Sequence, residues 1–327
     1  MIELRMGSQD VLRLRFAVSA LWEVLAAVRA VTTGPSLPAL RPWHVLIGPA
    51  LVGLDLSALA AVQADSRYTP DFLTPPPVAG ERGIEAELDL VQQTPTAVVR
   101  EELGRCLAER VTVAADDPLH VMVRRPAWAR GLLVRQLREA WEQLLLPYWP
   151  RLHRVLATDV DHRSRRLVGG GIAALLEDLD PDVEWADGTL RVRGPVRDRR
   201  DLAGEGVVLM PSVFVTGRPL VVMDPPYQPM LVYRARGTAS AFEAGVAPAD
   251  ALVRLLGTGR ADLLALLDSP AGTGSLALGL GRSAGTVSEH LQVLRTAGLV
   301  EVHRDGRSSR WTRTALGDAL VAGPLTT

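Results

Sequence analysis

The chain has 327 residues, of which 47% are hydrophobic, and its formal net charge is −1. That length allows two or three domains, and the apolar content excludes a largely disordered chain. The near-neutral charge excludes a protein that coats nucleic acid or membrane along its whole length, so any site for a polyanion must be local.

Cysteine usage and targeting features predict a cytoplasmic protein. Cys106 is the single cysteine, so neither an intrachain disulfide nor a cysteine-based zinc site can form. The N-terminus lacks the basic and then apolar layout of a signal peptide. The most apolar stretch, 43–54, is shorter than the roughly 20 residues that a membrane span needs.

The first 180 residues predict a short strand and then mainly helices. Apolar residues recur at helical spacing from Val11 to Val31, and Asp10 is the candidate N-cap. The proline-rich segment 74–83 predicts a loop. Further helices are expected at 43–64, 84–92, 95–110, 127–159 and 163–179, the fourth of them with a kink at Pro147 or Pro150.

Residues 183–236 predict a small β segment of three or four strands. Asp187-Gly188 is a strong hairpin signal, since both positions of such a turn favour residues that tolerate positive φ. The small-residue segment 236–248 predicts a domain boundary. The expected fold class is mainly α (α+β), with an N-terminal regulatory or dimerisation domain over 1–245, helical to about 180 and β-rich over 183–236.

The remaining residues, 246–327, predict a compact second domain. Ser283 is the expected N-cap of one helix and Thr314 that of the last, while Asp305-Gly306 is expected to join two strands. Helices are predicted at 248–256, 260–267, 274–281, 284–296 and 315–321, and strands at 299–304 and 308–313.

The helix after Ser283 has one apolar face and one polar face. Val287, Leu291 and Leu294 fall on the same side at helical spacing and are expected to be buried. A small residue, Ala277, and then Gly281 allow the preceding short helix to cross closely and turn sharply. This spacing predicts a helix-turn-helix, whose second helix enters the DNA major groove. The outward face would carry Gly285, Glu289 and Gln292, flanked by Thr286, Ser288 and Arg295.

The following hairpin concentrates positive charge. Between residues 282 and 313 there are six arginines and three acidic residues, in a chain that is otherwise slightly negative. An arginine-tipped ribbon can follow the phosphate backbone or enter the minor groove. The arginines are Arg282, Arg295, Arg304, Arg307, Arg310 and Arg313.

Several motifs in this region resemble the winged helix-turn-helix of the ArsR/SmtB family of bacterial transcription regulators. They are "SAGTVSEHL", "VLRTAGLV", the wing turn "RDGR" and the closing "TALGDAL". In addition, "DVLRLRFAVSALWEV" and "VVLMPSVFV" resemble an uncharacterised domain that precedes such wings in long actinobacterial members. The resemblance implies a dimeric, operator-binding repressor that an effector releases.

Combined with that resemblance, the pattern predicts a set of DNA-binding residues. Glu289 departs from the basic or neutral residue expected in the family, although a carboxylate can accept from cytosine. His290 could equally pack against the neighbouring helix. The predicted set is Ser283, Gly285, Thr286, Ser288, Glu289, His290, Gln292, Arg295, Arg304, Arg307, Ser308 and Arg310.

Other functions have less support in the sequence. The ArsR-like region offers no set of cysteine or histidine ligands, so we expect no metal and no cofactor. Ser212 has no nucleophile motif around it, and we expect no enzyme. His153, His162 and the run 163–166 are interpreted as solvated surface residues. A small non-metal effector could bind among Trp22, Trp43, Trp128, Trp141, Tyr148 and Trp149, although core packing explains them equally well.

The prediction is therefore a cytoplasmic, homodimeric transcriptional repressor that binds an operator in double-stranded DNA. The recognition helix is expected at 284–296 and the wing at 299–313. The alternative is a protein that binds a partner or an effector and whose winged helix docks protein instead of DNA.

Overall fold

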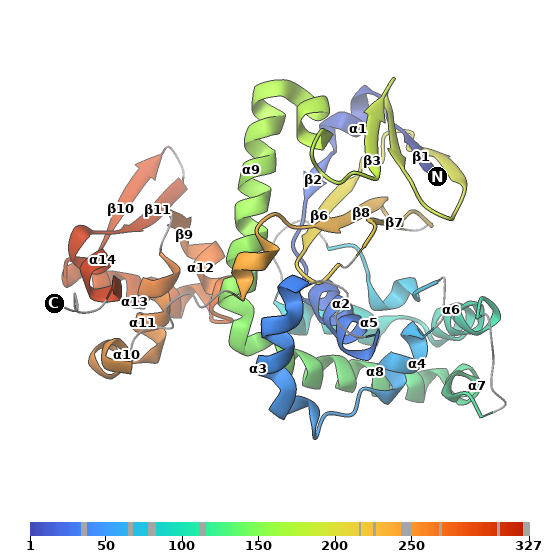
Figure 1. The fold of residues 1–327 in the computed structure, drawn as a ribbon, viewed down its shortest axis with the longest axis horizontal. Coiled ribbons are helices and arrows are strands. Elements are labelled where there is room, and N and C mark those ends of the chain that lie inside the picture. The colour runs from blue at the N-terminus through green and yellow to red at the C-terminus, as the bar shows by residue number, and fades with distance from the viewer. Residues whose placement is uncertain are drawn as a thin grey trace. The chain divides into compact units, whose positions relative to one another are not determined.

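A computed structural model describes residues 1–33, 38–64, 68–77, 83–110, 116–215, 217–224, 227–242, 250–267, 270–305 and 308–322 (Figure 1). The chain divides into two compact units. The first holds residues 1–145 and 155–239, and the second holds 146–154 and 240–327. The predicted division at residue 245 falls outside the described residues and stays a prediction. The fold is mainly helical with small sheets, as the sequence predicts.

The helical part of the first unit is organised around α8 (Pro126–Ala140), which packs against α2, α4, α5, α6 and α7. Its Gln136 side chain is buried and accepts hydrogen bonds from the first amides of α4, those of Ala58 and Leu59, both at 3.1 Å. The surrounding helices are α2 (Ala20–Thr33), α3 (Arg41–Leu51), α4 (Ser57–Gln63), α5 (Ile84–Gln93), α6 (Thr96–Ala108) and α7 (Pro118–Arg124).

Two four-stranded sheets complete the first unit. One has the strand order β3-β4-β1-β5, and the other has the order β2-β6-β8-β7, in which β2, β6 and β8 run parallel. The N-terminal strand β1 therefore pairs with strands almost 200 positions further along the chain. The strands are β1 (Ile2–Arg5), β2 (Arg15–Phe16), β3 (Val183–Ala186), β4 (Thr189–Val192), β5 (Asp198–Asp201), β6 (Val208–Ser212), β7 (Leu220–Val222) and β8 (Met230–Arg234).

The predicted hairpin is confirmed, because Asp187 and Gly188 take φ values of 51° and 70° between β3 and β4. The number of strands is not: the described residues from 183 to 236 hold six, where three or four were expected. The short β5 was missed because its sequence, DRRD, has no alternating apolar pattern, and pairing with the distant β1 supplies its stability instead.

Four helix predictions were wrong in extent. The helix expected over 11–31 is divided into α1 (Ser8–Leu12), β2 and α2, and Asp10 lies inside α1 instead of capping a helix. The helix expected over 43–64 is divided into α3 and α4. The segment after α8 passes through a π turn (Trp141–Leu145) and a 3₁₀ turn (Leu146–Tyr148) before α9 (Trp149–Leu176), which confirms the kink near Pro147. α9 then runs on through the gap expected at 160–162 and breaks at Gly171, whose φ is 69°.

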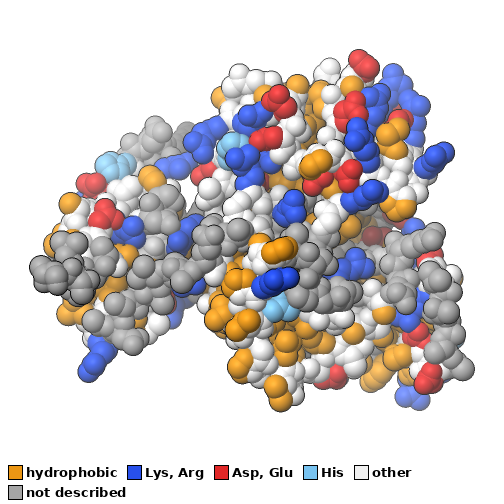
Figure 2. Space-filling model, in the orientation of Figure 1, with side chains coloured by type: hydrophobic (Ala, Val, Ile, Leu, Met, Phe, Trp, Pro, Cys, Tyr) orange, Lys and Arg blue, Asp and Glu red, His pale blue; other side chains and the backbone are white. Residues whose placement is uncertain are grey.

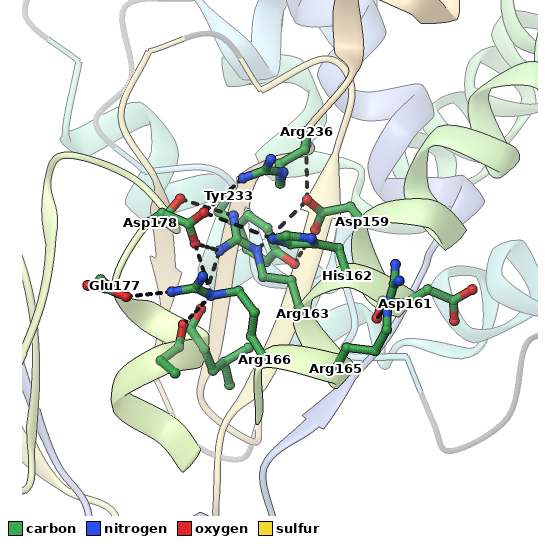
Figure 3. A network of polar contacts seen from close by, with 12 residues as sticks. Asp159, Asp161, His162, Arg163, Arg165, Arg166, Glu177, Asp178, Tyr233 and Arg236 are labelled. Carbon is green, nitrogen blue, oxygen red and sulfur yellow. Dashed lines mark hydrogen bonds and ion pairs between the residues drawn. The ribbon is translucent and has the colours of Figure 1, made fainter. Parts of the chain in front are cut away.

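A buried polar network joins α9 to β8 inside the first unit (Figure 3). Asp159 accepts hydrogen bonds from the Tyr233 hydroxyl at 2.7 Å and from the Arg236 amide at 3.0 Å. Arg163 is fully buried and donates to Asp178 at 2.6 Å. Burial alone would raise the pKa of Asp178, but Arg163, Arg166 and Arg236 outweigh it and hold that pKa below its usual value.

The network corrects the interpretation of 163–166 as a solvated run. Arg163 sits on the face of α9 that packs against β8, and its charge is compatible with burial because carboxylates and carbonyls surround it. His153 is also buried, with its ring 5.8 Å from that of Trp149. The arginine-rich sequence alone gives no sign of this, because the acidic partner Asp178 lies beyond the break in the helix.

The exposed surface of the first unit includes an apolar patch over α3 (Figure 2). Val45 and Leu46 on that helix are 79% and 48% exposed, and Val52, which follows the helix, is 90% exposed. None of the helices in the described part of the chain is long and apolar enough to cross a membrane.

The second unit contains the compact C-terminal module. Its core holds Leu263, Leu276, Val287, Leu291 and Trp311, all buried. The strands form a sheet of order β10-β11-β9. The elements are α10 (Asp250–Leu256), α11 (Thr258–Leu266), β9 (Ala271–Gly272), α12 (Thr273–Gly279), α13 (Ala284–Thr296), β10 (Val300–Asp305), β11 (Ser308–Arg313) and α14 (Ala315–Ala322), close to the predicted bounds.

Candidate nucleic-acid interface

Helices α12 and α13 form the predicted helix-turn-helix. Gly281 takes a left-handed φ of 60° in the turn, and the amide of Arg282 donates to the carbonyl of Ala277 at 2.9 Å. Ala277 itself is buried, as a close crossing requires. On α13, Val287, Leu291 and Leu294 face the core with at most 1% exposure. The burial of this face sends the polar face of α13 outward.

The start of the recognition helix is fixed by its own cap. The Ser283 hydroxyl accepts the amide of Thr286 at 3.1 Å and lies 2.9 Å from the Thr286 hydroxyl. The extended backbone of Ser283 is typical of an N-cap. Two predicted DNA-binding side chains are therefore brought together at the end of α13 that a major groove would receive, where the helix dipole also favours phosphate.

The polar face of α13 is open to solvent along its length. Most of its predicted residues are exposed, whereas Thr286 and His290 are half-buried. The exposed members are Ser283, Gly285, Ser288, Glu289, Gln292 and Arg295. Sequence reasoning did not single out Val293, which is 47% exposed on the same helix.

His290 leans toward the start of α11. A Cβ built on Gly259 would lie 3.2 Å from His290 Nε2, and the Arg282 guanidinium approaches the same glycine. The contact with Gly259 supports the packing role that the sequence left open for His290. The neighbouring residues Ser288, Glu289 and Gln292 on α13 remain exposed.

The wing is a two-stranded antiparallel ribbon. His303 pairs with Arg310 and Val302 pairs with Trp311. Trp311 is buried, and its indole donates to the Thr273 hydroxyl at 3.2 Å, which ties the ribbon to α12. Arg310 is exposed. Gly306 and Arg307 lie outside the described residues, as do the side chains of Arg304, Asp305 and Ser308.

Arg313 has a structural role instead of a free charge. Its guanidinium donates to Asp318 of α14 at 2.7 Å and to the carbonyl of Leu264 at 3.2 Å. Arg313 thus holds the closing helix and contributes less to the positive wing than the sequence count suggests. The predicted cap at Thr314 is confirmed, since its hydroxyl accepts the amide of Gly317 at 3.2 Å.

Residues 146–154 form part of the same unit and pack against α12 and the turn. The Trp149 indole donates to the carbonyl of Leu278 at 3.1 Å, and a Cβ built on Gly281 would lie 3.6 Å from Leu146. These residues support the first helix of the motif and leave the polar face of α13 uncovered.

The six aromatic residues that were candidates for an effector site differ in burial and in whether they line a cavity. Trp43, Trp141 and Trp149 are buried, Tyr148 is half-buried and Trp128 is 48% exposed. Only Trp22, among these six, lines a cavity described in the first unit. Among the described residues no group of histidine, cysteine and acidic side chains could hold a metal ion.

Comparisons with known families agree with this geometry. Residues 263–302 match the model of the bacterial regulatory proteins of the arsR family, and residues 97–239 match a family of unknown function, DUF5937. No curated protein and no solved structure matches the chain. The resemblance inferred from the motifs is thereby confirmed. The chain carries the DNA-binding domain of an ArsR-family transcriptional regulator behind a domain of unknown function.

Proposed function

We propose that the protein is a cytoplasmic, homodimeric repressor that binds a specific operator in double-stranded DNA. In this proposal α13 enters the major groove and the β10–β11 ribbon contacts the backbone or the minor groove. The observation that carries it is the exposed polar face of α13 on a domain that matches the arsR family. The same match favours a regulator over an enzyme.

The charge on this surface supports contact with phosphate. Arg295 at the end of α13 and Arg310 on the ribbon are both exposed, and no ion pair is described for either. Glu289 is also exposed on α13, so it would be aimed at a base edge and would oppose nearby phosphates. We expect Glu289 to restrict the DNA sequences that the protein binds and to lower its overall affinity for DNA.

Salt dependence tests DNA binding. Affinity for a random DNA pool should fall steeply as salt rises, because neutralised phosphates release counterions. Arg310→Ala should reduce the slope of log K against log salt by about 0.9 for one lost phosphate contact. Arg193→Ala is the matched control, since this arginine is 63% exposed in the first unit. An affinity that does not change with salt, or an equal effect of both variants, would contradict the proposal.

Selection of preferred sites tests the dimer. Two copies related by a two-fold axis should select near-palindromic sites with half-sites about 10 base pairs apart. Single, unpaired half-sites among the selected sequences would argue for a monomer. Repression is then tested by placing a selected site in a promoter.

The alternative is that the winged helix docks a protein. The exposed Glu289 and Val293 on α13 favour it, because a carboxylate and an apolar side chain suit a protein surface better than phosphate. It predicts little affinity for DNA at any salt concentration. We further propose that a small non-metal effector controls the protein.

A further inference from the structure

A cavity of about 240 Å³ lies within the first unit. Its walls come from α2, the end of α4, the segment 68–74, the residues after β6, and β7. An engineered cavity of about 150 Å³ holds benzene, so this volume suits a single substituted ring.

The cavity lies where parallel sheets usually bind ligands. β2 and β6 are parallel, and the chain that leaves their carboxyl ends contributes Trp22 and then Phe214 and Val215 to the wall. Backbone groups and helix starts converge beyond the carboxyl ends of such strands, and ligands bind there in many unrelated proteins. The position therefore favours a binding site over a packing defect.

Three aromatic side chains, those of Trp22, Tyr68 and Phe214, line the cavity, and neighbouring side chains hold each of them in place. The Phe214 ring lies 4.6 Å from the ring of Trp43. The Tyr68 ring has the Arg105 guanidinium 4.0 Å from its centroid, and its hydroxyl donates to Asp71 at 2.9 Å. Trp22 packs in the cluster of buried residues around β6 and β8. Rigid aromatic walls of this kind favour a planar ligand, because little side-chain entropy is lost on binding.

Two buried polar atoms on the lining residues have no hydrogen-bond partner among the described residues. They are Trp22 Nε1, a donor, and Gln63 Oε1, an acceptor. The other amide atom of Gln63 is occupied, since it donates to the carbonyl of Leu25 at 2.8 Å. A buried polar atom without a partner costs free energy, and a ligand with one acceptor and one donor would satisfy both atoms.

The charged groups favour an anion. Arg29 and Arg218 line the cavity together with Asp71, and Arg218 is already paired with Asp182 at 3.2 Å, which leaves Arg29 as the cation that a ligand would meet. Burial lowers the pKa of Arg29, which shows that its surroundings disfavour the positive charge. Burial raises the pKa of Asp71, and the Tyr68 hydroxyl already occupies that carboxylate. A bound carboxylate would stabilise the Arg29 guanidinium, whereas a cation would be repelled.

The loop after β6 is fixed in advance by a buried carboxylate. Glu23 accepts the amide of Val213 at 3.0 Å, and the Ser212 hydroxyl accepts the amides of Phe214 and Val215, both at 3.2 Å. These contacts hold the wall that carries Phe214 against α2. The site is thus formed before any ligand binds.

We propose that this cavity binds a small aromatic acid that also carries a hydroxyl or N–H group. The ring lies among Trp22, Tyr68 and Phe214, the carboxylate accepts from Trp22 Nε1 and faces Arg29, and the hydroxyl donates to Gln63 Oε1. Binding of this ligand is independent of DNA, and its role as the effector rests on the proposed function.

Isothermal titration of the full-length protein without DNA tests the binding. The probes are 4-hydroxybenzoate, benzoate and benzamidine, which share a ring and differ in charge and in the added hydroxyl. We expect one 4-hydroxybenzoate per chain, weaker binding of benzoate, and benzamidine weaker than benzoate by roughly tenfold or more. The inference is overturned if 4-hydroxybenzoate gives no heat of binding at millimolar concentration, or if benzamidine binds as well as benzoate.

Two variants locate the ligand. Ala26 is half-buried on the cavity wall, and Ala26→Leu should fill the space and abolish binding while keeping a good helix former. Trp22→Phe keeps an aromatic ring, removes the donor and should weaken 4-hydroxybenzoate by roughly tenfold or more. Trp128→Phe, at a half-exposed position on α8, is the control and should bind as the natural protein does. Unchanged binding by both cavity variants would place the ligand elsewhere and refute the site.

A second measurement separates this inference from the proposed function. A saturating concentration of 4-hydroxybenzoate should change the affinity for a selected DNA site in the natural protein, and should have no effect in Ala26→Leu. If the titration shows binding but DNA affinity does not change, the site stands and its role as effector site is refuted. If no DNA binds at all, the proposed function fails and the titration still decides the cavity.

Discussion

The C-terminal module and the first unit use polar side chains in opposite ways. In the described part of 250–322, every buried side chain is apolar, and the polar groups of α13 face solvent. The first unit instead buries charged residues, among them Glu23, Asp159 and Arg163. Burial of a charge costs free energy unless partners surround it, so these groups must be held by a specific structure.

The difference indicates where the functional polar groups of each part of the molecule lie. A module with an apolar core and an open polar face suits a partner from outside, and the helix-turn-helix is of this kind. The first unit directs polar groups inward, where many are paired and several atoms, among them Trp22 Nε1 and Gln63 Oε1, have no hydrogen-bond partner among the described residues. In the first unit the functional evidence therefore lies inside the fold, whereas in the module it lies on the surface.

Removal of one buried carboxylate should give the largest change in stability. Asp159→Ala leaves the buried Tyr233 hydroxyl and the Arg236 amide without their shared acceptor, and it removes the carboxylate that lies 3.8 Å from the fully buried Arg163. We expect the free energy of unfolding to fall by about 4 to 5 kcal/mol, as is typical when one partner of a buried charged pair is lost. Urea denaturation followed by circular dichroism measures it.

The matched control lies two residues along the same helix. Asp161 is exposed, so Asp161→Ala should change the free energy of unfolding by no more than about 0.5 kcal/mol. Equal effects of the two variants would show that the network is a surface feature and would remove the contrast between the two parts of the chain.

In the module the sensitive residues should be apolar. Leu291 is fully buried in the core behind α13, and Leu291→Ala should cost about 3 to 4 kcal/mol through lost contacts and the cavity left behind. The adjacent Gln292→Ala should leave stability within about 0.5 kcal/mol of the natural protein and weaken operator binding instead. A large loss of stability in Gln292→Ala would mean that the polar face of α13 is part of the core.

The same contrast explains which parts of the fold could be predicted from the sequence. The module consists of local, strongly periodic elements, so the spacing of Val287, Leu291 and Leu294 was enough to predict the buried face of α13. Its capping residues, Ser283 and Thr314, are also local signals. The hairpin at Asp187-Gly188 belongs to this class, because the turn itself determines the pairing.

Features that depend on distant pairing could not be predicted. Helical spacing over 11–31 was misleading, since Arg15 and Phe16 pair with β6 almost 200 positions away and form a strand. The cavity likewise combines α2 with β7, and the partner of Arg163 lies beyond a helix break. No local pattern records such contacts. Unpartnered polar atoms on residues that line the cavity exist only in three dimensions.

The pH dependence of stability tests the inward-facing groups of the first unit. Burial raises the pKa of Glu23 from 4.5 to about 7, although hydrogen bonds with Ser212, Val213 and Phe214 lower it. The folded protein therefore holds this proton more tightly than the unfolded chain. The contribution is greatest below the unfolded pKa and is lost as pH rises through about 7, so the free energy of unfolding should fall over that range.

Glu23→Gln should reduce this fall by about 3 kcal/mol, because the amide keeps an acceptor and cannot ionise. Chemical denaturation at pH 5 and pH 8 measures the difference. Part of the fall should remain, since burial also raises the pKa of Glu102 to about 7. A variant with the full pH dependence of the natural protein would show that Glu23 ionises freely and is not buried against the β6 loop.

The smallest expected effect concerns the cap of the recognition helix, where stability and DNA binding can be separated. Ser283→Ala removes the acceptor for the Thr286 amide and should cost about 1 kcal/mol. Ser283→Asp caps a helix as well as serine does, so stability should return. Its added negative charge would face DNA phosphates, so operator affinity should stay below that of the natural protein. Recovery of both properties in Ser283→Asp would mean that the start of α13 does not approach the DNA backbone, and the groove-facing surface would then lie further along the helix.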